Sequence, residues 1–496
     1  TSLNHNIAGV FTDSLTNIER IKGSSTVSNT LTGNNMNNTL IGGNQTDTIK
    51  GVSGNNSLSG GAGNDTIFAG SGSDTIDGGA GDDWLDYTDL ASTNISVDLR
   101  SNTATYGSST DSITAIEHLK MGNGTNTVQG NSYANSFIGG TGTDTLSYSE
   151  AASGVTVNVT SAGAGTSSGD GADVFTGFEN YILSGNADTI NLNVVHNGSI
   201  IDGGTGIDTA SYANVTTALT VTVNSGNTSA RVSDGTKTDT LQNIEKIIGG
   251  DGNDTFIVSN VAGINTLDGD GGTNTLQLSG SLDLSSVTLL NFNNILIANG
   301  DTLTLNAVDL SGKTMNINML GTGSLIIVSD ASSHDFSNIT VTKGTGTVTL
   351  DVNINKDISA TNINNIIDKF DVASGSTLTL SYSQFNGHTG VGTGTLKLSD
   401  TSLTGTQIKS VNDASTNAID LTNVTTISTA TMAEMLEIVN NTGATFTTAA
   451  NYAVTISDTS SASDVNIVAG DTNGVVTATI VDGAVTTTLN AIGNVA

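Results

Sequence analysis

Residues 60–86 read GGAGNDTIF, AGSGSDTID and GGAGDDWLD, which are three consecutive units of one nine-residue pattern. Each unit has a glycine-rich turn, an Asp at position six and a short strand with one large apolar residue at position eight: Ile67, Ile76 or Leu85. The same period extends without insertion over residues 24–86. A short fixed period predicts a solenoid, because one unit can bury its apolar side chain only when the next coil covers it.

The nonapeptide pattern returns later in smaller groups, separated by longer segments. These groups lie at residues 121–147, 203–211, 249–257 and 260–277. Units of the pattern run into a tyrosine at three places, Tyr87, Tyr148 and Tyr212, and each tyrosine precedes a strand of alternating apolar and polar residues. We therefore expect a larger module to be repeated along this part of the chain.

A second signature follows each of these strands: an Asp, four residues, a large apolar residue and a Glu. The glutamates are Glu117, Glu179 and Glu245, and an earlier copy of the signature ends at Glu19. Two interpretations are open. Each Glu either forms a structural corner, where it accepts backbone N–H groups at a coil boundary, or it ligates a cation directly. We favour the structural corner, because backbone donors at such a boundary need acceptors.

From about residue 278 the glycine–aspartate turns stop and a different repeat begins. Residues 287–313 and 362–388 correspond at an offset of 75 residues, so that Leu303 matches Leu378. Alternating apolar and polar residues indicate half-buried strands throughout. This half is predicted to be all-β, and the choice between a continued solenoid and small sandwiches is open.

These patterns divide the sequence into four parts. We predict a β-roll over residues 1–86, β-roll blocks with interspersed tyrosine–strand–glutamate modules over 87–277, an all-β repeat domain over 278–400 and a C-terminal β domain over 401–496. One helix is expected in the last part, with Thr431 as its cap and Glu434 three residues later. The predicted fold class is all-β, with a parallel β-roll or β-solenoid in the N-terminal half.

The chain is strongly acidic, with 46 Asp and Glu residues against 14 Lys and Arg and a formal net charge of −32. Such a charge argues against nucleic acid and anionic membranes as partners, since both call for basic surfaces. No apolar run approaches the ~18 residues of a membrane span. Cys and Pro are absent, and a β-solenoid explains the missing proline because it needs most backbone N–H groups in a ladder. No signal peptide or initiator Met is visible at Thr1, so we expect a processed or truncated piece of something longer.

The turns offer the ligands that calcium prefers. Their glycines allow closely spaced backbone carbonyls, and position six adds one carboxylate, whereas calcium takes six to eight oxygens at roughly 2.3–2.6 Å. Two turns stacked on one edge can supply such a set. With two units per coil, same-edge turns lie 18 residues apart, which places Asn29, Asp47, Asp65 and Asp83 on one edge and Asn38, Asn56 and Asp74 on the other. We predict stronger calcium binding on the aspartate edge, because Asn contributes no charge.

The nonapeptides resemble the calcium-binding repeats of the RTX family, which form a parallel β-roll. The resemblance covers about residues 13–277 and is most specific over 42–86, where Gln45, Asn55 and Asn56 depart from the pattern. It implies several Ca²⁺ ions, held by position-six aspartates and turn glycines. The residues so implied are Asp47, Gly60, Gly61, Gly63, Asp65, Asp74, Gly78, Gly79, Gly81, Asp83, Asp144, Asp208 and Asp254. It also implies type I secretion from a Gram-negative cell, with an uncleaved C-terminal signal.

No enzymatic activity is expected. The five histidines are far apart, and the HExxH motif of metalloproteases in this family is missing. Residues 165–169 (GTSSG) match GxSxG formally, but without the strand–elbow–helix context that this motif needs.

The chain is most similar to surface-layer (S-layer) proteins of bacteria that contain RTX repeats, which combine β-roll segments with Thr/Asn/Ala-rich β domains. This resemblance implies a calcium-dependent structural protein on the cell surface that assembles with copies of itself. Cell-surface polysaccharide or lipopolysaccharide would be a partner of a region outside this chain, and neither nucleic acid nor membrane insertion is expected. The alternatives are an RTX adhesin or matrix fibre, and the C-terminal secretion portion of a larger toxin or hydrolase.

Overall fold

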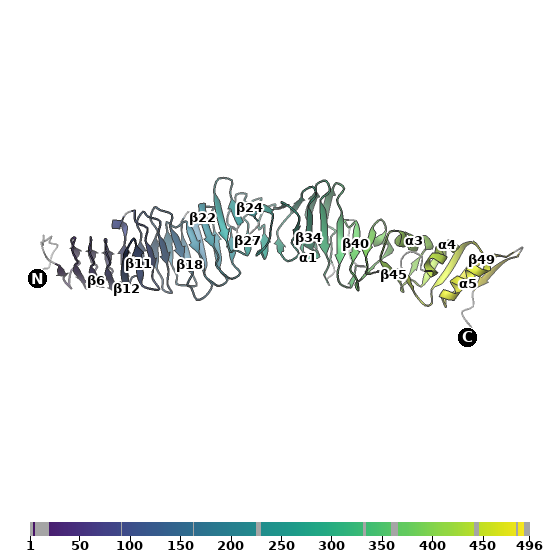
Figure 1. Ribbon diagram of the computed structural model, residues 1–496, viewed down its shortest axis with the longest axis horizontal. Coiled ribbons are helices and arrows are strands. Elements are labelled where there is room, and N and C mark those ends of the chain that lie inside the picture. Colours follow the sequence, from purple (N-terminus) through teal and green to yellow (C-terminus); the bar gives the residue numbers. More distant parts are fainter. Residues whose placement is uncertain are drawn as a thin grey trace. The chain divides into compact units, whose positions relative to one another are not determined.

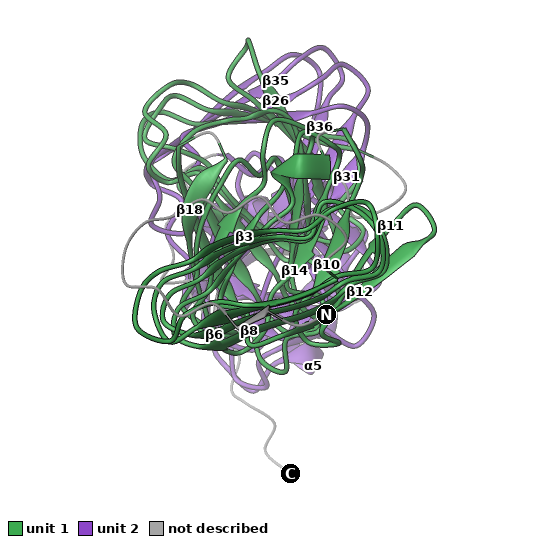
Figure 2. Ribbon diagram, turned by 90° about the vertical axis from the view of Figure 1, so that its left-hand side faces the viewer, with its two compact units in different colours: residues 1–275, 289–291 green, residues 276–288, 292–496 purple. Residues whose placement is uncertain are grey.

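The computed structural model describes residues 3–4, 19–90, 92–161, 163–224, 230–330, 334–358, 366–440, 446–482 and 485–490. It is nearly all-β, with 9% helix, as predicted. The chain forms two compact units (Figure 1, Figure 2): unit 1 is Thr1–Thr275 with Leu289–Asn291, and unit 2 is Leu276–Thr288 with Phe292–Ala496. Each unit is a stack of short, mainly parallel strands, which is the architecture of a β-solenoid.

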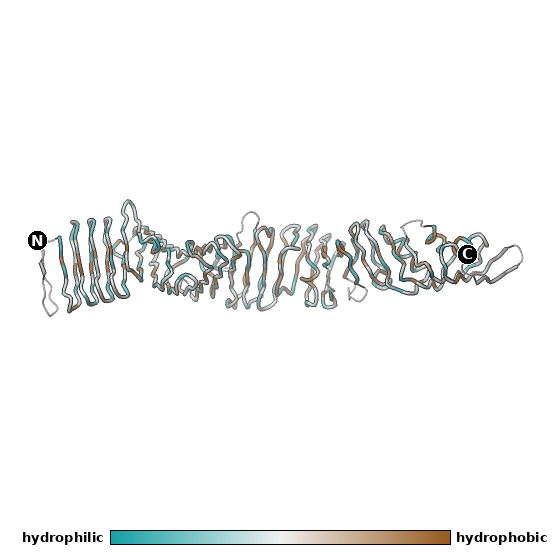
Figure 3. Tube along the Cα trace, turned by 90° about the horizontal axis from the view of Figure 1, so that it is seen from below, coloured by the Kyte–Doolittle hydropathy of each residue, from teal (hydrophilic) through white to brown (hydrophobic). Residues whose placement is uncertain are grey.

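The nonapeptide run forms coils of two strands each, one strand in each of two facing sheets. One sheet contains β2 (Arg20–Lys22), β4 (Thr39–Gly43), β6 (Ser57–Ala62) and β8 (Thr75–Ala80), and the other contains β3 (Thr30–Thr32), β5 (Thr48–Lys50), β7 (Thr66–Phe68) and β9 (Trp84–Asp86). Residues 18 apart pair in parallel register, so Leu58 lies beside Ile76 and Ile67 beside Leu85. All four side chains are buried, and Figure 3 shows such apolar positions recurring from coil to coil.

The tyrosine–strand–glutamate modules insert three strands into one sheet. In the first module β12 (Ser109–Thr114) pairs with β8, β11 (Thr103–Tyr106) lies antiparallel to β12, and β10 (Ser96–Asp98) pairs with β14 (Thr127–Gln129) of the next coil. We call this element a three-strand insert. The second insert, in the opposite sheet, is β17 (Thr156–Ser161), β18 (Ala164–Ser168) and β19 (Val174–Thr176), and the third, in the first sheet again, is β24 (Thr220–Val223), β25 (Ala230–Ser233) and β26 (Thr238–Gln242).

Ordinary coils continue between and after the inserts. Their strands are β13 (His118–Lys120), β15 (Ser136–Ile138), β16 (Thr145–Ser147), β20 (Asn180–Ile182), β21 (Thr189–Leu192), β22 (Asn197–Asp202), β23 (Thr209–Ser211), β27 (Lys246–Ile248), β28 (Thr255–Val258), β29 (Thr266–Asp268) and β30 (Thr275–Leu278). The repeated module of the sequence is therefore one supersecondary element used three times.

Unit 2 is also a parallel stack, which decides between the two architectures left open for this half in favour of the solenoid. Its paired strands include β34 (Thr302–Asn306), β36 (Ser324–Val328), β38 (Val348–Val352), β40 (Lys369–Val372), β41 (Thr377–Leu380), β43 (Thr395–Leu398), β45 (Ala418–Leu421), β46 (Thr426–Ala430), β48 (Ala453–Ser460) and β49 (Val476–Asp482). The one-turn helices α1 (Ala307–Leu310) and α2 (Tyr382–Phe385), which follow β34 and β41, begin 75 residues apart.

The expectation of one helix within 401–496 is wrong. The described part of this segment contains α3 (Gly405–Asp413), α4 (Met432–Val439) and α5 (Ala462–Asp471), and only α4 was predicted. The sequences of α3 and α5 contain Gly, Asn, Asp and β-branched residues of low helix propensity. Caps compensate for this, since the Thr404 and Ser461 side chains accept backbone N–H groups in their first turns. The C-terminal secretion signal stays a prediction, and residues 491–496 lie outside the described residues.

Candidate calcium-binding turns

The position-six residues of one edge form a hydrogen-bonded ladder from coil to coil. Asp47 Oδ1 accepts the backbone N–H of Asn29 at 2.5 Å, Asp65 Oδ1 that of Asp47 at 2.7 Å, and Asp83 Oδ1 that of Asp65 at 2.7 Å. Each bond spans 18 residues, as the two-unit coil predicts. One oxygen of each carboxylate is therefore committed to holding neighbouring coils together.

The second oxygen of each of these carboxylates is buried and unpartnered. Among the described residues, Oδ2 of Asp47, Asp65 and Asp83 has no hydrogen-bond donor, although the three residues are at most 1% exposed. A buried carboxylate without a partner is costly, by several kcal/mol per ion. A cation at this position would remove that cost.

A backbone carbonyl of the next coil converges on the same point. A Cβ built on Gly60 would lie 2.3 Å from Asp65 Oδ2 and 2.4 Å from the carbonyl oxygen of Gly78. The turn before it repeats this, with Asp47 Oδ2 and the Gly60 oxygen both 2.4 Å from a Cβ on Gly42. The missing Cβ leaves a cradle of oxygens from two coils, and carboxylate and carbonyl oxygens are the ligands that calcium takes.

The other predicted turn glycines have backbone conformations that suit no other residue. Gly61, Gly63, Gly79 and Gly81 have φ values of +113°, +111°, +104° and +144°. A side chain here would also meet the backbone of the previous coil, since a Cβ on Gly79 would lie 2.0 Å from the Gly61 oxygen. These glycines therefore permit the close stacking that brings the carbonyls of two turns together.

The electrostatics of the turns oppose a negative charge in the absence of a cation. Burial raises the pKa values of Asp47 and Asp65 above the ordinary range. Burial, with the neighbouring Asp65 and Glu117 carboxylates, raises the pKa of Asp83 to about 6. The same causes raise the pKa of Asp144 to about 6, beside Glu179, and that of Asp208 to about 7, beside Asp188 and Glu245. A divalent cation would reverse this preference by pairing with the ionised form.

The family model for the RTX calcium-binding nonapeptide repeat matches four times, at residues 26–58, 50–85, 122–150 and 244–259. These repeats make the chain an RTX-type calcium-binding protein. No curated protein matches the chain. Proteins with RTX repeats are typically secreted, and no helix in the described residues is long and apolar enough to cross a membrane.

The opposite edge of the RTX run has different hydrogen bonds, because the NH₂ groups of its Asn side chains are donors. Asn56 Oδ1 accepts the N–H of Asn38 at 2.9 Å, while its Nδ2 donates to the turn carbonyl of Gly54 at 3.0 Å. Only Asp74 on this edge leaves an unpartnered buried oxygen. The NH₂ group of the Asn side chain thus donates to a carbonyl that a cation would otherwise bind. Calcium binding should therefore be weaker on this edge for a second reason, in addition to the missing negative charge.

In the later RTX blocks, some position-six aspartates have an unpartnered oxygen and others do not. Asp144 and Asp208 have buried, unpartnered Oδ2 atoms like those of the first run. Asp254, which was also predicted to bind calcium, differs because its Oδ1 accepts the N–H of Leu219 and its Oδ2 that of Gly250, both at 2.7 Å. Its turn is already closed by protein donors in this structure.

The three signature glutamates form the structural corners that the sequence suggested. Oε2 of Glu117 accepts the N–H of Asp83 at 2.9 Å. Glu179 and Glu245 accept those of Asp144 and Asp208, both at 2.8 Å. For the earlier copy, which ends at Glu19, the preceding residues 5–18 lie outside the described residues.

The partner of each signature Asp is a tyrosine, which was not predicted from the sequence. The hydroxyl groups of Tyr87, Tyr148 and Tyr212 donate to Oδ2 of Asp111, Asp173 and Asp239 at 2.9, 2.8 and 2.9 Å. All six side chains are at most 1% exposed. The sequence did contain a signal for this pairing, namely the similar spacing of 24, 25 or 27 residues between each Tyr and its Asp. Ser167, the serine of the formal GxSxG match, donates to Asp173 in the same cluster and so has a structural role.

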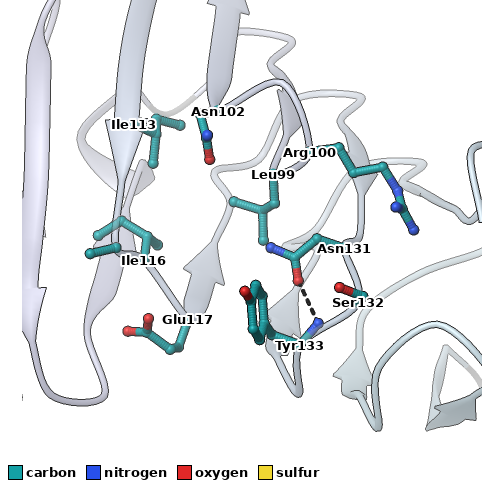
Figure 4. A pocket seen from close by; sticks show the side chains of 10 residues that line it. Leu99, Arg100, Asn102, Ile113, Ile116, Glu117, Asn131, Ser132 and Tyr133 are labelled. Carbon is teal, nitrogen blue, oxygen red and sulfur yellow. Dashed lines mark hydrogen bonds between the residues drawn. The ribbon is translucent and has the colours of Figure 1, made fainter.

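A pocket of about 360 Å³ opens beside the first insert, lined by residues of the β10–β11, β12–β13 and β14–β15 turns. Figure 4 shows Glu117 and Tyr133 near one end of the pocket and Arg100 near the other. Arg100 is paired with Asp170, so its charge is already used. No group of three or more His, Asp or Glu side chains gathers as a metal centre within the described residues.

Proposed function

We propose that this chain is a structural protein of a bacterial surface layer, in which calcium stiffens the β-roll and links neighbouring protomers. The observation that carries the proposal is the row of buried, unpartnered carboxylate oxygens along the RTX turns. These oxygens need a cation for the coils to be stable at neutral pH, so the stiffness of the stack depends on extracellular calcium.

The charge of the chain supports a role for calcium between protomers as well. A net charge of −32 makes two copies repel each other. Divalent cations at the shared surface would offset this repulsion and allow a lattice to form. The first partner is therefore a second copy of the chain, with cell-surface polysaccharide or lipopolysaccharide bound by a region outside it. The location is the outer surface of a Gram-negative cell, reached by type I secretion.

A structural role also fits the architecture better than a catalytic one. Both units consist of repeated coils whose polar clusters, such as Tyr87 with Asp111, hold strands together. Extended repeats of this kind present a periodic surface, which suits assembly into arrays.

Electron microscopy of the purified protein with calcium, and after addition of a chelator, tests this proposal. We expect ordered two-dimensional sheets with calcium and dispersed protomers without it. Sheets that survive the chelator intact would refute the role of calcium in the lattice. Single fibres with calcium would favour the adhesin or matrix alternative, and monomers under both conditions would favour a secretion segment of a larger protein.

A further inference from the structure

The turn at each junction between an RTX block and a three-strand insert is shorter than an RTX turn. Across the RTX turn, Ile76 and Leu85 are nine residues apart, whereas their paired residues Ile113 and Leu119 are six apart. The other two inserts repeat this difference, since Phe175 and Tyr181, and Leu241 and Ile247, pair with residues nine apart. Glu117, Glu179 and Glu245 stand in these short turns.

Each of these glutamates takes the position of the next Asp in the ladder. Glu117 precedes His118, which pairs with Trp84, so Glu117 lies in register with Asp83. Its Oε2 accepts the Asp83 N–H as an Asp would from the next coil. The longer Glu side chain thus spans a gap that the shorter turn would leave.

The carbonyl of the cradle is also kept. A Cβ on Gly78 would lie 1.9 Å from the Ala115 oxygen and 2.7 Å from Asp83 Oδ2, the same arrangement as at Gly60. Ala115 has a φ of +49°, rare for a residue with a side chain, and the equivalent residues Gly177 and Asn243 have φ values of +78° and +50°. Their carbonyl oxygens lie 2.0 Å from a Cβ on Gly139 and 2.1 Å from one on Gly203. Three short turns therefore adopt an unusual backbone that points a carbonyl at the cradle.

At the opposite edge of each insert, the protein itself supplies a donor to the buried carboxylate. There the second oxygen of Asp111, Asp173 or Asp239 accepts a tyrosine hydroxyl. At the glutamate edge, Oδ2 of Asp83, Asp144 and Asp208 is fully buried and has no donor among the described residues. The fold supplies a donor on one edge and leaves an oxygen cradle on the other.

From this geometry we propose that Asp83 with Glu117, Asp144 with Glu179 and Asp208 with Glu245 form three mixed calcium sites, in which the glutamate is a second charged ligand. Each ion would bind the Asp Oδ2, the carbonyl of Ala115, Gly177 or Asn243, and the glutamate carboxylate. Every insert would then be joined to its RTX block by an ion. The proposal rests on calcium binding by the RTX turns, and not on assembly into a surface layer.

The single tryptophan makes one of these sites observable by itself. Trp84 follows Asp83 directly, and its ring lies 4.9 Å from that of His118, the residue after Glu117. Tb³⁺, a luminescent substitute for Ca²⁺, bound beside Asp83 would be excited by energy transfer from Trp84. Excitation at the red edge of tryptophan absorption avoids the tyrosines, and displacement by Ca²⁺ reports calcium affinity.

The test compares the full chain with its variants E117Q, E179Q and E150Q. Gln keeps an oxygen that can accept the Asp83 N–H, so E117Q separates the corner role of Glu117 from a ligand role. We expect E117Q to weaken Trp84-sensitised binding by about tenfold or more, the scale of one lost unit charge beside a divalent ion. E179Q alters the equivalent site at the end of the β9–β13–β15–β19 series, three strand pairings from the site at Asp83. E150Q changes an exposed glutamate outside these sites. Both should leave the Trp84 signal unchanged.

An E117Q titration that superimposes on that of the unaltered chain would overturn the proposal, because Glu117 would then be a corner only. Absence of any Trp84-sensitised Tb³⁺ signal in the unaltered chain would overturn calcium binding at this turn as a whole. Neither result depends on whether sheets form, so failure of this proposal can be told apart from failure of the surface-layer role. The calcium-free unfolding temperature of E117Q should match that of the unaltered chain, which checks that the fold is kept.

Discussion

Replacing Asp65 by Asn isolates the charge of one RTX carboxylate from its place in the ladder. Asp65 Oδ1 accepts the N–H of Asp47 at 2.7 Å, and an Asn oxygen can accept it equally well, as Asn56 does on the opposite edge. The change removes the charge of Oδ2, which is buried without a donor. Because Asp65 lies between two stacked turns, two neighbouring calcium sites each lose a charged ligand.

The expected loss follows from linkage. An ion present at 100 times its Kd stabilises the folded state by about 2.7 kcal/mol, so two sites contribute about 5 kcal/mol. D65N should remove most of this calcium-dependent stabilisation. In calcium-free solution at neutral pH the variant should be as stable as the unaltered chain or more so, because it no longer buries an uncompensated charge.

Hydrogen exchange of the backbone amides in residues 42–86, with and without calcium, measures this effect locally. A local measurement is needed because a stack of repeats does not unfold in a single two-state step. We expect the unaltered chain to gain protection there on addition of calcium, and D65N to gain little. Asn56→Ala on the opposite edge is the matched control and should keep the gain. Equal losses in both variants would refute the two-edge reasoning.

Three further changes test the remaining features of the turns. Asn56→Asp replaces the amide that donates to the Gly54 carbonyl by a second charge beside Asp74, and calcium titration by calorimetry should detect at least one added ion. Tyr87→Phe leaves Asp111 Oδ2 buried without a donor and should lower the local stability of the first insert by about 1–3 kcal/mol, measured by hydrogen exchange, to the same extent with and without calcium. In calcium-free solution, stability should fall as pH rises from about 5 to 8, since the raised pKa values, about 6 for Asp83 and about 7 for Asp208, favour protonated carboxyls in the folded state. Thermal unfolding over this pH range checks the sign, and saturating calcium should abolish or reverse the trend.

Much of this architecture could be predicted from the period of the sequence. Apolar residues nine apart, such as Ile67 and Ile76, specify two facing sheets, and the 18-residue coil follows from them. The ladder from Asp47 to Asp83 follows in turn, because identical positions of successive coils must stack. The inserts could not be predicted in this way, since their strands turn back antiparallel and pair at sequence separations that do not follow the 18-residue period. The role of Tyr87 depends on such a long-range contact.

The C-terminal helices show a second limit of sequence patterns. Helix α4 was predicted from its cap and apolar spacing, whereas α3 has few strong helix formers and is stabilised by its cap and by burial of Ile408 and Val411. The start of a helix can also be stabilised by a residue outside the helix. Asp458, 26 residues after Met432, accepts the Met432 N–H with its Oδ1 at 2.8 Å at the start of α4. Asp400 does the same for Tyr382 of α2 at 2.6 Å. Asp400 and Asp458 each follow a Ser, and each therefore caps a helix of the preceding coil.

Three turns of unit 1 illustrate different solutions to one electrostatic problem. Every coil brings backbone carbonyls and a position-six side chain into a small buried space, and something positive must lie between them. Asn56 supplies its own NH₂ group, Asp111 receives a tyrosine hydroxyl, and Asp65 is left with a bare oxygen that calcium can bind. Only the third solution depends on the medium. Calcium should therefore control the RTX run and its junctions, while the edges closed by tyrosine keep their hydrogen bonds without it.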